Sequence, residues 1–407
     1  MSMHTNEQVI AVCEKFAFDA PVADLVVCGN GHINSTYFVT TETGKRYILQ
    51  ILNTAIFKDP VGVMNNIVAV TEHIRAGLVA AGEDAERGTL RVVYTTDGKN
   101  GYVDEEGRFW RAYDFVEGTV CRLTVDSSET FARVGEAFGD FQRRLADFDA
   151  SALIDSIPNF HNTKKRYATF LATVEKDVAG RVASVQDEIR FITDRAEKCA
   201  LIVDALESGE LPLRVTHNDT KLSNILLDEV TEEAVCIIDL DTVMPGSSLY
   251  DFGDSIRSGA TDAAEDEPDL DKVHFLPDMF KAYARGFIKG CNGALTEKEI
   301  SMLPDGGYII TLEQAIRFLT DYLDGDNYFH VDYPDHNLVR TRTQIKLVAE
   351  TEQYMDELRA FVADVVKQEI VIRWMMKQNR NFLCDYSSVA RRIRWATPSL
   401  TREGLQR

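Results

Sequence analysis

The sequence lacks the features that direct a chain into a membrane or out of the cell. None of its apolar runs approaches the roughly 20 residues that a membrane-spanning helix requires. No basic segment followed by an apolar stretch is present near the N-terminus, so we expect no secretory signal peptide. The seven cysteines are odd in number and form no C-x-x-C pair, which argues against a disulfide framework and a zinc site. These absences predict a cytoplasmic protein.

The sequence also has fewer basic than acidic residues. The chain of 407 residues holds 44 Lys and Arg against 65 Asp and Glu, a formal net charge of -21 at pH 7. Nucleic acids and anionic membrane surfaces would be repelled by such a chain, so we expect neither as a partner. A neutral or cationic small molecule is compatible with this charge, whereas a nucleotide would have to enter a locally positive or metal-bearing pocket. The sequence leaves the oligomeric state open.

The most informative stretch is residues 215–241, where a polar loop lies between short apolar runs. The loop reads H-x-D-x-x-x-x-N and supplies Asp219 and Asn224, and Asp239 ends the last apolar run. This is the order of a kinase catalytic loop followed by a metal-binding strand. One carboxylate accepts the proton of the substrate hydroxyl, while an amide oxygen and a second carboxylate hold the magnesium that bridges the nucleotide phosphates.

We expect this stretch to form a β-hairpin, with residues 222–227 and 234–238 as its strands. A polar surface turn between two core strands is the competing interpretation, because Asn and Asp are ordinary turn formers. We expect His217 to orient the loop by hydrogen bonding rather than to take part in the chemistry.

The whole chain divides at Gly118 into a β-rich part and a helical part. We expect a five-stranded sheet before Gly118, with helices at 5–18 and 61–81. The strand-like segments are 25–28, 35–41, 46–52, 90–94, 102–104 and 109–116, and the later helical segments are 131–148, 167–206, 276–291, 311–323 and 339–379. We therefore predict an α+β, two-lobed protein-kinase-like fold. Its N-lobe (1–117) would bind nucleotide, and its C-lobe (118–407) would carry the catalytic hairpin and the substrate-binding helices.

Several further stretches extend the kinase pattern and are similar to one superfamily. The similar stretches are residues 29–37, 46–50, 217–224, 238–246, 251–257, 316–325 and 336–343. Together they resemble the aminoglycoside phosphotransferase and choline kinase superfamily, and within it the N-acetylhexosamine 1-kinase group. The resemblance runs from about residue 25 to about residue 350.

This resemblance implies transfer of the γ-phosphoryl group of ATP to the anomeric hydroxyl of N-acetylglucosamine or N-acetylgalactosamine. It makes Asp219 the catalytic base, and Asn224 and Asp239 the magnesium ligands. A hemiacetal hydroxyl is more acidic than an ordinary alcohol, so a carboxylate can accept its proton late in the transfer. Asp241 either supports a second metal or braces the loop.

For the nucleotide, the resemblance implies contacts from the glycine turn, the third strand, the segment between the lobes and the catalytic loop. The implied residues are Gly29, Gly31, Asn34, Gln50, Tyr113, Phe115 and Lys221. The side chains of Tyr113 and Phe115 could equally belong to the core, with adenine contacts made by the backbone of 112–116.

One of these residues departs from the protein-kinase pattern. Gln50 stands where protein kinases carry a strand lysine that holds the α- and β-phosphates. Glutamine brings no charge, and Glu72 in the following helix would lack its usual partner. Magnesium, Lys221 and the amides of the glycine turn are the candidates for neutralising the phosphates.

For the sugar, the resemblance implies His32, Arg317 and Tyr328, with Asp219 completing the pocket. A bidentate arginine suits adjacent hydroxyls, although Arg317 could instead be a paired structural residue. We expect Arg257 to brace the neighbouring loop by pairing with Asp251 or Asp254.

Two alternatives to an N-acetylhexosamine kinase stay open. The first is a kinase for a cationic acceptor such as an aminoglycoside or choline, which the acidic composition favours and a substrate-facing arginine would oppose. The second is a non-catalytic nucleotide- or sugar-binding protein, which predicts the loss of Asp219, Asn224 or Asp239. The sequence does not distinguish N-acetylglucosamine from N-acetylgalactosamine.

Overall fold

The structure is a computed structural model that describes residues 5–28 and 34–394, with side chains up to residue 371. The chain divides into two compact units, one that ends at Val362 and one that begins at Ala363. The described part of the second unit is the C-terminal stretch of a single long helix. Among the described helices, none is long and apolar enough to cross a membrane.

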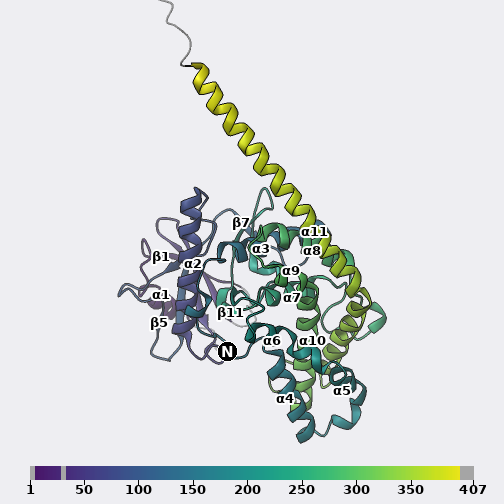
Figure 1. Ribbon diagram of the computed structural model, residues 1–407. Coiled ribbons are helices and arrows are strands. Elements are labelled where there is room, and N and C mark those ends of the chain that lie inside the picture. Colours follow the sequence, from purple (N-terminus) through teal and green to yellow (C-terminus); the bar gives the residue numbers. More distant parts are fainter. Residues whose placement is uncertain (1–4, 29–33, 395–407) are drawn as a thin grey trace, which may run out of the picture. The chain divides into compact units, whose positions relative to one another are not determined.

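The N-lobe is built on an antiparallel sheet in the order β1-β2-β3-β6-β4, with β5 also paired to β6 (Figure 1). Its strands are β1 (Val22–Cys28), β2 (Ser35–Thr41), β3 (Arg46–Leu52), β4 (Val92–Val93), β5 (Tyr102–Val103) and β6 (Phe109–Asp114). All six strand-like segments form strands, so the predicted count of five was wrong; β4 and β5 are separate short strands that pair with different parts of the same edge of β6. Val92 lies opposite Tyr113, and Tyr102 lies opposite Trp110.

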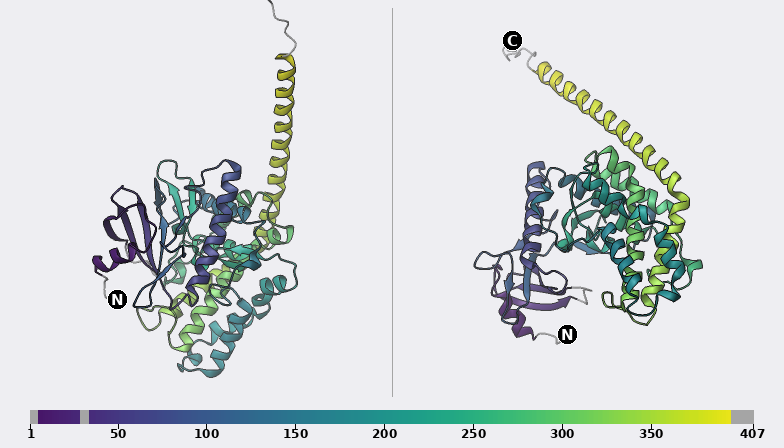
Figure 2. Two further views of the ribbon diagram at one scale, coloured as in Figure 1. Left: turned by 90° about the vertical axis from the view of Figure 1, so that its left-hand side faces the viewer. Right: turned by 60° about the horizontal axis from the view of Figure 1, so that its bottom comes forward.

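Helices cover both faces of this sheet; the helix predicted at 61–81 is confirmed, whereas the one predicted at 5–18 ends at Cys13 and Phe16 instead bridges to Thr95. The first, α1 (Asn6–Cys13), begins at a capping box in which Thr5 and Gln8 satisfy each other's backbone N–H groups. The second, α2 (Pro60–Ala81), runs beside the sheet in the views of Figures 1 and 2 and ends at Gly82, whose φ of +70° suits glycine.

Side chains alternate between these two faces along each strand. On β6, Trp110 packs in the core under α1, whereas Phe109 and Tyr113 pack in the core that includes α2. Arg111 therefore shares the α2 face of the sheet with Phe109 and Tyr113, the face that looks toward the catalytic residues.

The C-lobe is mostly helical, as predicted. Its helices are α3 (Ser128–Arg144), α4 (Thr163–Lys176), α5 (Gln186–Thr193), α6 (Leu201–Glu207), α7 (Ser248–Gly259), α8 (Pro277–Cys291), α9 (Glu297–Ser301), α10 (Leu303–Asp324) and α11 (His336–Arg394). The helical stretch expected at 167–206 is divided among α4, α5 and α6, since Asp177 and Gly180 adopt positive φ and end α4.

The helices α3 and α8 pack closely because both carry glycines at their contact. A Cβ atom at Gly286 would collide with the backbone oxygen of Ala132, and one at Gly135 would collide with the backbone oxygen of Tyr283. This close packing holds α3 firmly, and α3 in turn contacts the catalytic loop.

The predicted hairpin is present in the C-lobe, but its first strand begins at Ile225 and not at Leu222, because residues 222–224 form a 3-10 turn. Strand β9 (Ile225–Asp228) pairs with β10 (Ala234–Ile237) on one side and with β7 (Thr119–Cys121) on the other. Strand β8 (Arg214–Thr216) pairs with β11 (Met244–Gly246). The loop 217–224 thus connects β8 to β9, and Asp239 follows β10.

Candidate active site

His217 orients the loop from the inside. Its side chain is buried, and its ring lies edge-on to Phe138 and Phe141 of α3, at centroid distances of 5.6 Å and 6.0 Å. Its Nε2 is 2.9 Å from the backbone oxygen of Ile238, and its Nδ1 accepts a hydrogen bond of 3.2 Å from the N–H of Asp219. These partners require the tautomer protonated at Nε2. His217 therefore ties the catalytic loop to the end of β10.

Asp251, in the first turn of α7, accepts hydrogen bonds from the backbone of the same loop. Its buried carboxylate accepts hydrogen bonds from the backbone N–H groups of His217 (3.0 Å) and Asn218 (2.8 Å) and from Nε2 of Gln142 (2.7 Å). Burial raises the pKa of Asp251, and these hydrogen bonds oppose the shift. Asn218 adopts the left-handed region (φ +66°), which asparagine tolerates, and in this conformation its N–H reaches the carboxylate of Asp251.

Arg257 braces the loop through Asp254. The guanidinium of Arg257 pairs with Asp254 at 3.1 Å and with Glu265 at 2.8 Å. Asp254 accepts the N–H of Thr220 at 2.9 Å. Of the two expected partners of Arg257, the structure shows Asp254 and not Asp251.

Asp219, Lys221 and Asn224 lie in direct contact. The amide of Asn224 donates to the backbone oxygen (2.8 Å) and to a carboxylate oxygen (3.0 Å) of Asp219. The other carboxylate oxygen lies 2.7 Å from Nζ of Lys221. Burial alone would lower the pKa of Lys221, but the charge and hydrogen bond of Asp219, together with the charge of Asp254, outweigh it and raise that pKa. The proposed base is thus held from both sides and stays partly open to solvent.

Asp239 is a carboxylate without a hydrogen-bond or ion-pair partner among the described residues. It follows β10 in the left-handed region (φ +58°), and its side chain reaches solvent. The surrounding protein removes part of its hydration, and Asp241 and Asp219 add negative charge, so its pKa is raised to about 6. The arrangement concentrates negative charge at one accessible point, which favours binding of a cation.

Asn34, a predicted nucleotide-binding residue of the N-lobe, contacts Asp241 of the C-lobe. Asn34 donates its amide to Asp241 at 2.7 Å and accepts the N–H of Asn53 at 3.0 Å. Asp241 also pairs with Arg111. Both carboxylate oxygens of Asp241 therefore have protein partners, which favours the bracing interpretation over a second metal.

Gln50 makes its contacts along the sheet. Its Oε1 accepts a hydrogen bond of 3.0 Å from Nε of Arg111, and its Nε2 donates to Thr36 at 3.0 Å. Glu72 is half-exposed and pairs only with Arg75, one turn along α2 (3.6 Å). Sequence reasoning missed Arg111, although a single charge inside the apolar strand β6 was a visible signal.

Tyr113 and Phe115 have their side chains in packing contacts. Tyr113 is buried, and its hydroxyl lies 3.8 Å from Sδ of Met64. The ring of Phe115 packs edge-on to Phe38 and under the guanidinium of Arg46 at 4.0 Å. These positions favour the interpretation in which only the backbone of 112–116 contacts adenine.

Arg317 and Tyr328 come together at a separate pocket. The Arg317 guanidinium lies 5.9 Å from the ring of Tyr328 and 5.4 Å from that of Phe329. The pocket encloses about 160 Å³. Its lining residues are Arg166, Thr169, Ile316, Arg317, Thr320, Asp321, Asp324, Tyr328 and Phe329. Within the described residues no direct contact joins Arg317 or Tyr328 to Asp219.

Arg166 is a second arginine of this pocket that the sequence did not single out. It donates to the backbone oxygen of Phe160 at 3.2 Å, while its Nε is buried without a partner. Burial and the like charge of Arg317 lower the pKa of Arg166. Arg317 donates to Oε1 of Gln314 at 3.1 Å, and neither arginine forms an ion pair with a described carboxylate within 4 Å, so both retain donors for a ligand.

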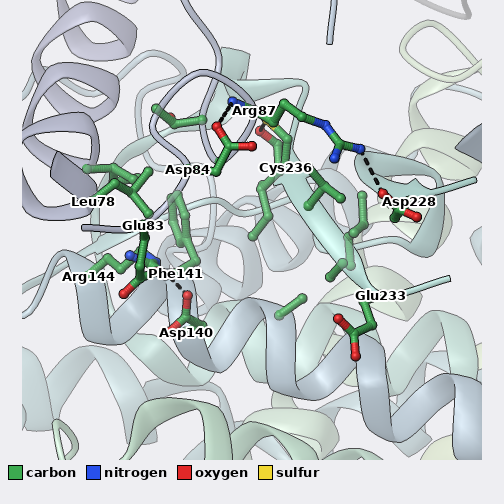
Figure 3. A pocket seen from close by; sticks show the side chains of 18 of the residues that line it. Leu78, Glu83, Asp84, Arg87, Asp140, Phe141, Arg144, Asp228, Glu233 and Cys236 are labelled. Carbon is green, nitrogen blue, oxygen red and sulfur yellow. Dashed lines mark hydrogen bonds and ion pairs between the residues drawn. The ribbon is translucent and has the colours of Figure 1, made fainter. Parts of the chain in front are cut away.

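Another cavity, of about 450 Å³, includes Phe141 and Leu240 in its lining (Figure 3). It is formed by the end of α2, by α3 and by the outer face of the β9–β10 hairpin. At its rim, Arg87 pairs with Asp228 at 2.9 Å, and Arg144 pairs with Glu83 at 2.6 Å. No predicted site residue lines it.

Three predicted residues, Gly29, Gly31 and His32, lie outside the described residues. The expected phosphate contacts of the glycine turn and the expected sugar contact of His32 therefore remain predictions.

Comparison with known proteins agrees with this geometry. The model of the phosphotransferase enzyme family (APH) matches residues 24–284. An aminoglycoside phosphotransferase from Alicyclobacillus acidocaldarius has a similar structure, with a TM-score of 0.54 and 15% identity over 91% of this chain and 98% of its own. A microcompartment-associated aminopropanol kinase gives 0.53 and 17% over 87% and 98%. A spectinomycin phosphotransferase in complex with ADP and spectinomycin gives 0.54 and 13% over 88% and 99%.

Proposed function

Because this chain belongs to the phosphotransferase enzyme family and is a small-molecule phosphotransferase, we propose that it transfers the γ-phosphoryl group of ATP to the anomeric hydroxyl of an N-acetylhexosamine. The observation that carries the proposal is the contact of Asp219 with Lys221 and Asn224 on a loop held beside Asp239. This set fits phosphoryl transfer, in which positioning and charge neutralisation dominate. It also opposes a non-catalytic protein, since all three chemical groups are present and mutually oriented.

In the proposed mechanism Asp219 takes the proton of the anomeric hydroxyl. The oxygen of that hydroxyl forms a bond to the γ-phosphorus of ATP, the bond from that phosphorus to the β,γ-bridging oxygen breaks, and ADP leaves. Each carboxylate oxygen of Asp219 has one protein partner and keeps a further lone pair for the proton. Lys221 fixes the carboxylate by an ion pair. In the proposed mechanism it would also contact the transferred phosphoryl group.

Asn224 and Asp239 fit a magnesium ion. Asn224 directs its N–H groups to Asp219, which leaves its carbonyl oxygen available, and Asp239 is unpartnered and accessible among the described residues. Across the described part of the chain there is no cluster of three or more His, Cys, Asp or Glu side chains that could hold a metal alone. Magnesium suits such a site, because it commonly takes one or two protein ligands and completes its shell with phosphate oxygens and water. When bound, it would neutralise the phosphate charge.

The arginines of the Arg317 pocket support a sugar acceptor, whereas the exposed carboxylate of Asp324 in the same lining would favour a cationic one. Two guanidinium groups with unused donors would repel an ammonium group and would bind hydroxyl or acyl oxygens. The carboxylate of Asp321 is already occupied by the N–H groups of residues 327–329 and by Asn337. The rings of Tyr328 and Phe329 supply the apolar surface that a sugar ring can cover.

Turnover with ATP and magnesium against four acceptors tests the proposal. The acceptors are N-acetylglucosamine, N-acetylgalactosamine, choline and kanamycin, and phosphorus NMR locates the phosphate on the product. A sugar 1-phosphate is the expected product. Turnover with choline or kanamycin alone would retain the phosphoryl transfer and overturn the sugar assignment.

A further inference from the structure

The strand lysine that Gln50 replaces has a structural substitute on the next strand. Gln50 of β3 lies directly opposite Arg111 of β6 in the sheet register. Both side chains point to the face that looks toward the catalytic residues. The Arg111 side chain is 2% exposed and donates from Nε to Gln50 at 3.0 Å.

The guanidinium of Arg111 joins the two lobes. Its partner Asp241 lies in the turn Leu240–Thr242, which follows the catalytic hairpin, and is 5% exposed. Asn34 completes the group by donating to Asp241 and accepting from Asn53. The network therefore extends from β2 and β3 through β6 to Asp241, two positions after Asp239.

A pair of this kind has a demanding geometry. Burial of a charge is unfavourable unless it is paired and hydrogen-bonded, so Arg111 and Asp241 each depend on the other's position. Such pairs contribute little net stability but can specify one arrangement of the groups around them. Here the pair would specify the conformation of the turn that follows Asp239. Arg111 also lies close enough to Asp239 for its charge to oppose the rise in the pKa of that carboxyl.

Two other described cations near the nucleotide residues, Lys45 and Lys221, are about half-exposed, whereas Arg111 is buried. Lys45, just before β3, pairs with Asp114 at 3.1 Å. Lys221 is about half-exposed and pairs with Asp219. Neither occupies the sheet position that a strand lysine would take, whereas Arg111 is adjacent to it.

We propose that Arg111 is a positioning residue that compensates for the missing strand lysine: tied to Asp241 and Gln50, it fixes the turn that carries Asp239 relative to the N-lobe sheet. This inference rests on the proposed function as an ATP-dependent kinase. It does not depend on the identity of the acceptor.

The test measures equilibrium binding of AMP-PNP with magnesium by calorimetry, together with the melting temperature, in the full-length protein. Arg111→Met should weaken binding at least tenfold and lower the melting temperature, since Asp241 is left buried and unpaired. Arg111→Lys should retain part of the affinity, because it keeps the charge but loses the fork that reaches Gln50 and Asp241 together.

The double variant Arg111→Met/Asp241→Asn separates positioning from stability. With no buried charge left unpaired, its melting temperature should recover most of the loss while binding stays at least tenfold weaker than in the wild type. Recovery of nucleotide affinity along with stability would show that Arg111 is only a structural partner of Asp241 and would overturn the proposal. Equal affinity of Arg111→Met and the wild type would overturn it as well.

Arg195→Met is the matched control. Arg195 pairs with Glu352 at 2.7 Å in the C-lobe and contacts none of the residues named above, so its loss should leave nucleotide affinity within twofold of the wild type. A wild-type protein that binds magnesium and AMP-PNP but phosphorylates no sugar would refute the proposed acceptor alone. Failure of the proposed acceptor and failure of the proposed role of Arg111 are therefore distinguishable.

Discussion

Asn224 donates its side-chain amide to Asp219 twice, at 2.8 Å to the backbone oxygen and at 3.0 Å to the carboxylate. The proposed metal ligand and the proposed base are thus fixed to each other by a contact inside one loop. A displacement of either group moves the other, so acceptor activation and metal binding are coupled by geometry. Lys221 holds the opposite oxygen of the same carboxylate at 2.7 Å and leaves Asp219 little freedom to turn.

Asp219→Asn should abolish most of the turnover and leave nucleotide binding nearly unchanged. The amide has the shape of the carboxylate but cannot accept the hydroxyl proton, and loss of a general base typically costs about 10²- to 10⁴-fold in rate. Steady-state kinetics and AMP-PNP calorimetry check both halves of this expectation. Near-full activity in the variant would remove Asp219 from the role of base.

Asp239→Asn should impair magnesium-dependent nucleotide binding. The variant loses the single accessible carboxylate proposed to bind the metal, so nucleotide affinity should become almost independent of magnesium concentration. Calorimetric titrations at several magnesium concentrations measure this dependence. An unchanged dependence would exclude Asp239 from the metal site.

The apo protein should respond to pH through Asp239 in a defined direction. Its folded-state pKa of about 6 lies above the ordinary value of 3.8, so the folded state binds the proton more tightly than the unfolded state. Stability is therefore lost as pH rises from about 4 through 6. Asp239→Asn should raise the melting temperature at pH 8 and not at pH 3.5. Equal shifts at both pH values would contradict the raised pKa.

Asp251→Ala should destabilise the fold and the catalytic loop together. The substitution leaves the buried N–H groups of His217 and Asn218 and the amide of Gln142 without their acceptor. Unsatisfied buried donors cost about 1–3 kcal/mol each, so we expect a loss of about 3 kcal/mol or more in the free energy of unfolding. Urea denaturation measures it. Asp187→Ala, which changes a fully exposed carboxylate, should stay within about 0.5 kcal/mol.

Arg317→Met and Arg166→Met should each lower kcat/KM for the sugar by about tenfold to a hundredfold, the range for a lost charged hydrogen bond. The KM for ATP should not change, because this pocket shares no contact with the described nucleotide residues. Arg190→Met, at an exposed position on α5, provides the control. A loss in the ATP parameters instead would place these arginines outside the acceptor pocket.

Much of the site could be predicted because its central residues are close in sequence. Asp219, Asn224 and Asp239 lie within 21 positions, and local rules govern the whole segment. The loop pattern supplies polar groups at fixed spacing, and the apolar runs on either side form β9 and β10. Arg317 and Tyr328 were named from the family resemblance; the structure places Arg317 on α10 and Tyr328 four residues after its end, with the guanidinium 5.9 Å from the ring.

The errors and omissions share a physical cause. The six strand-like segments named from the sequence all form strands, and the count of five was wrong because β4 and β5 both pair with β6, each as a separate strand. Arg166 was missed because α4 reads as an ordinary surface helix until α10 packs against it. The hydrogen-bond partner of Gln50 depends on the strand register, which places Arg111 of β6 opposite it.

The sequence by itself determined the fold class, the hairpin and the order of base, amide and carboxylate, because short-range spacing and apolar periodicity specify turns, strands and helices. Only the tertiary structure decided where the positive charge lies. Arg111 and Asp241 are 130 positions apart, and nothing local relates them. They meet because β6 joins the N-lobe sheet with its α2 face toward the C-lobe, where a buried guanidinium is stable only next to a buried carboxylate.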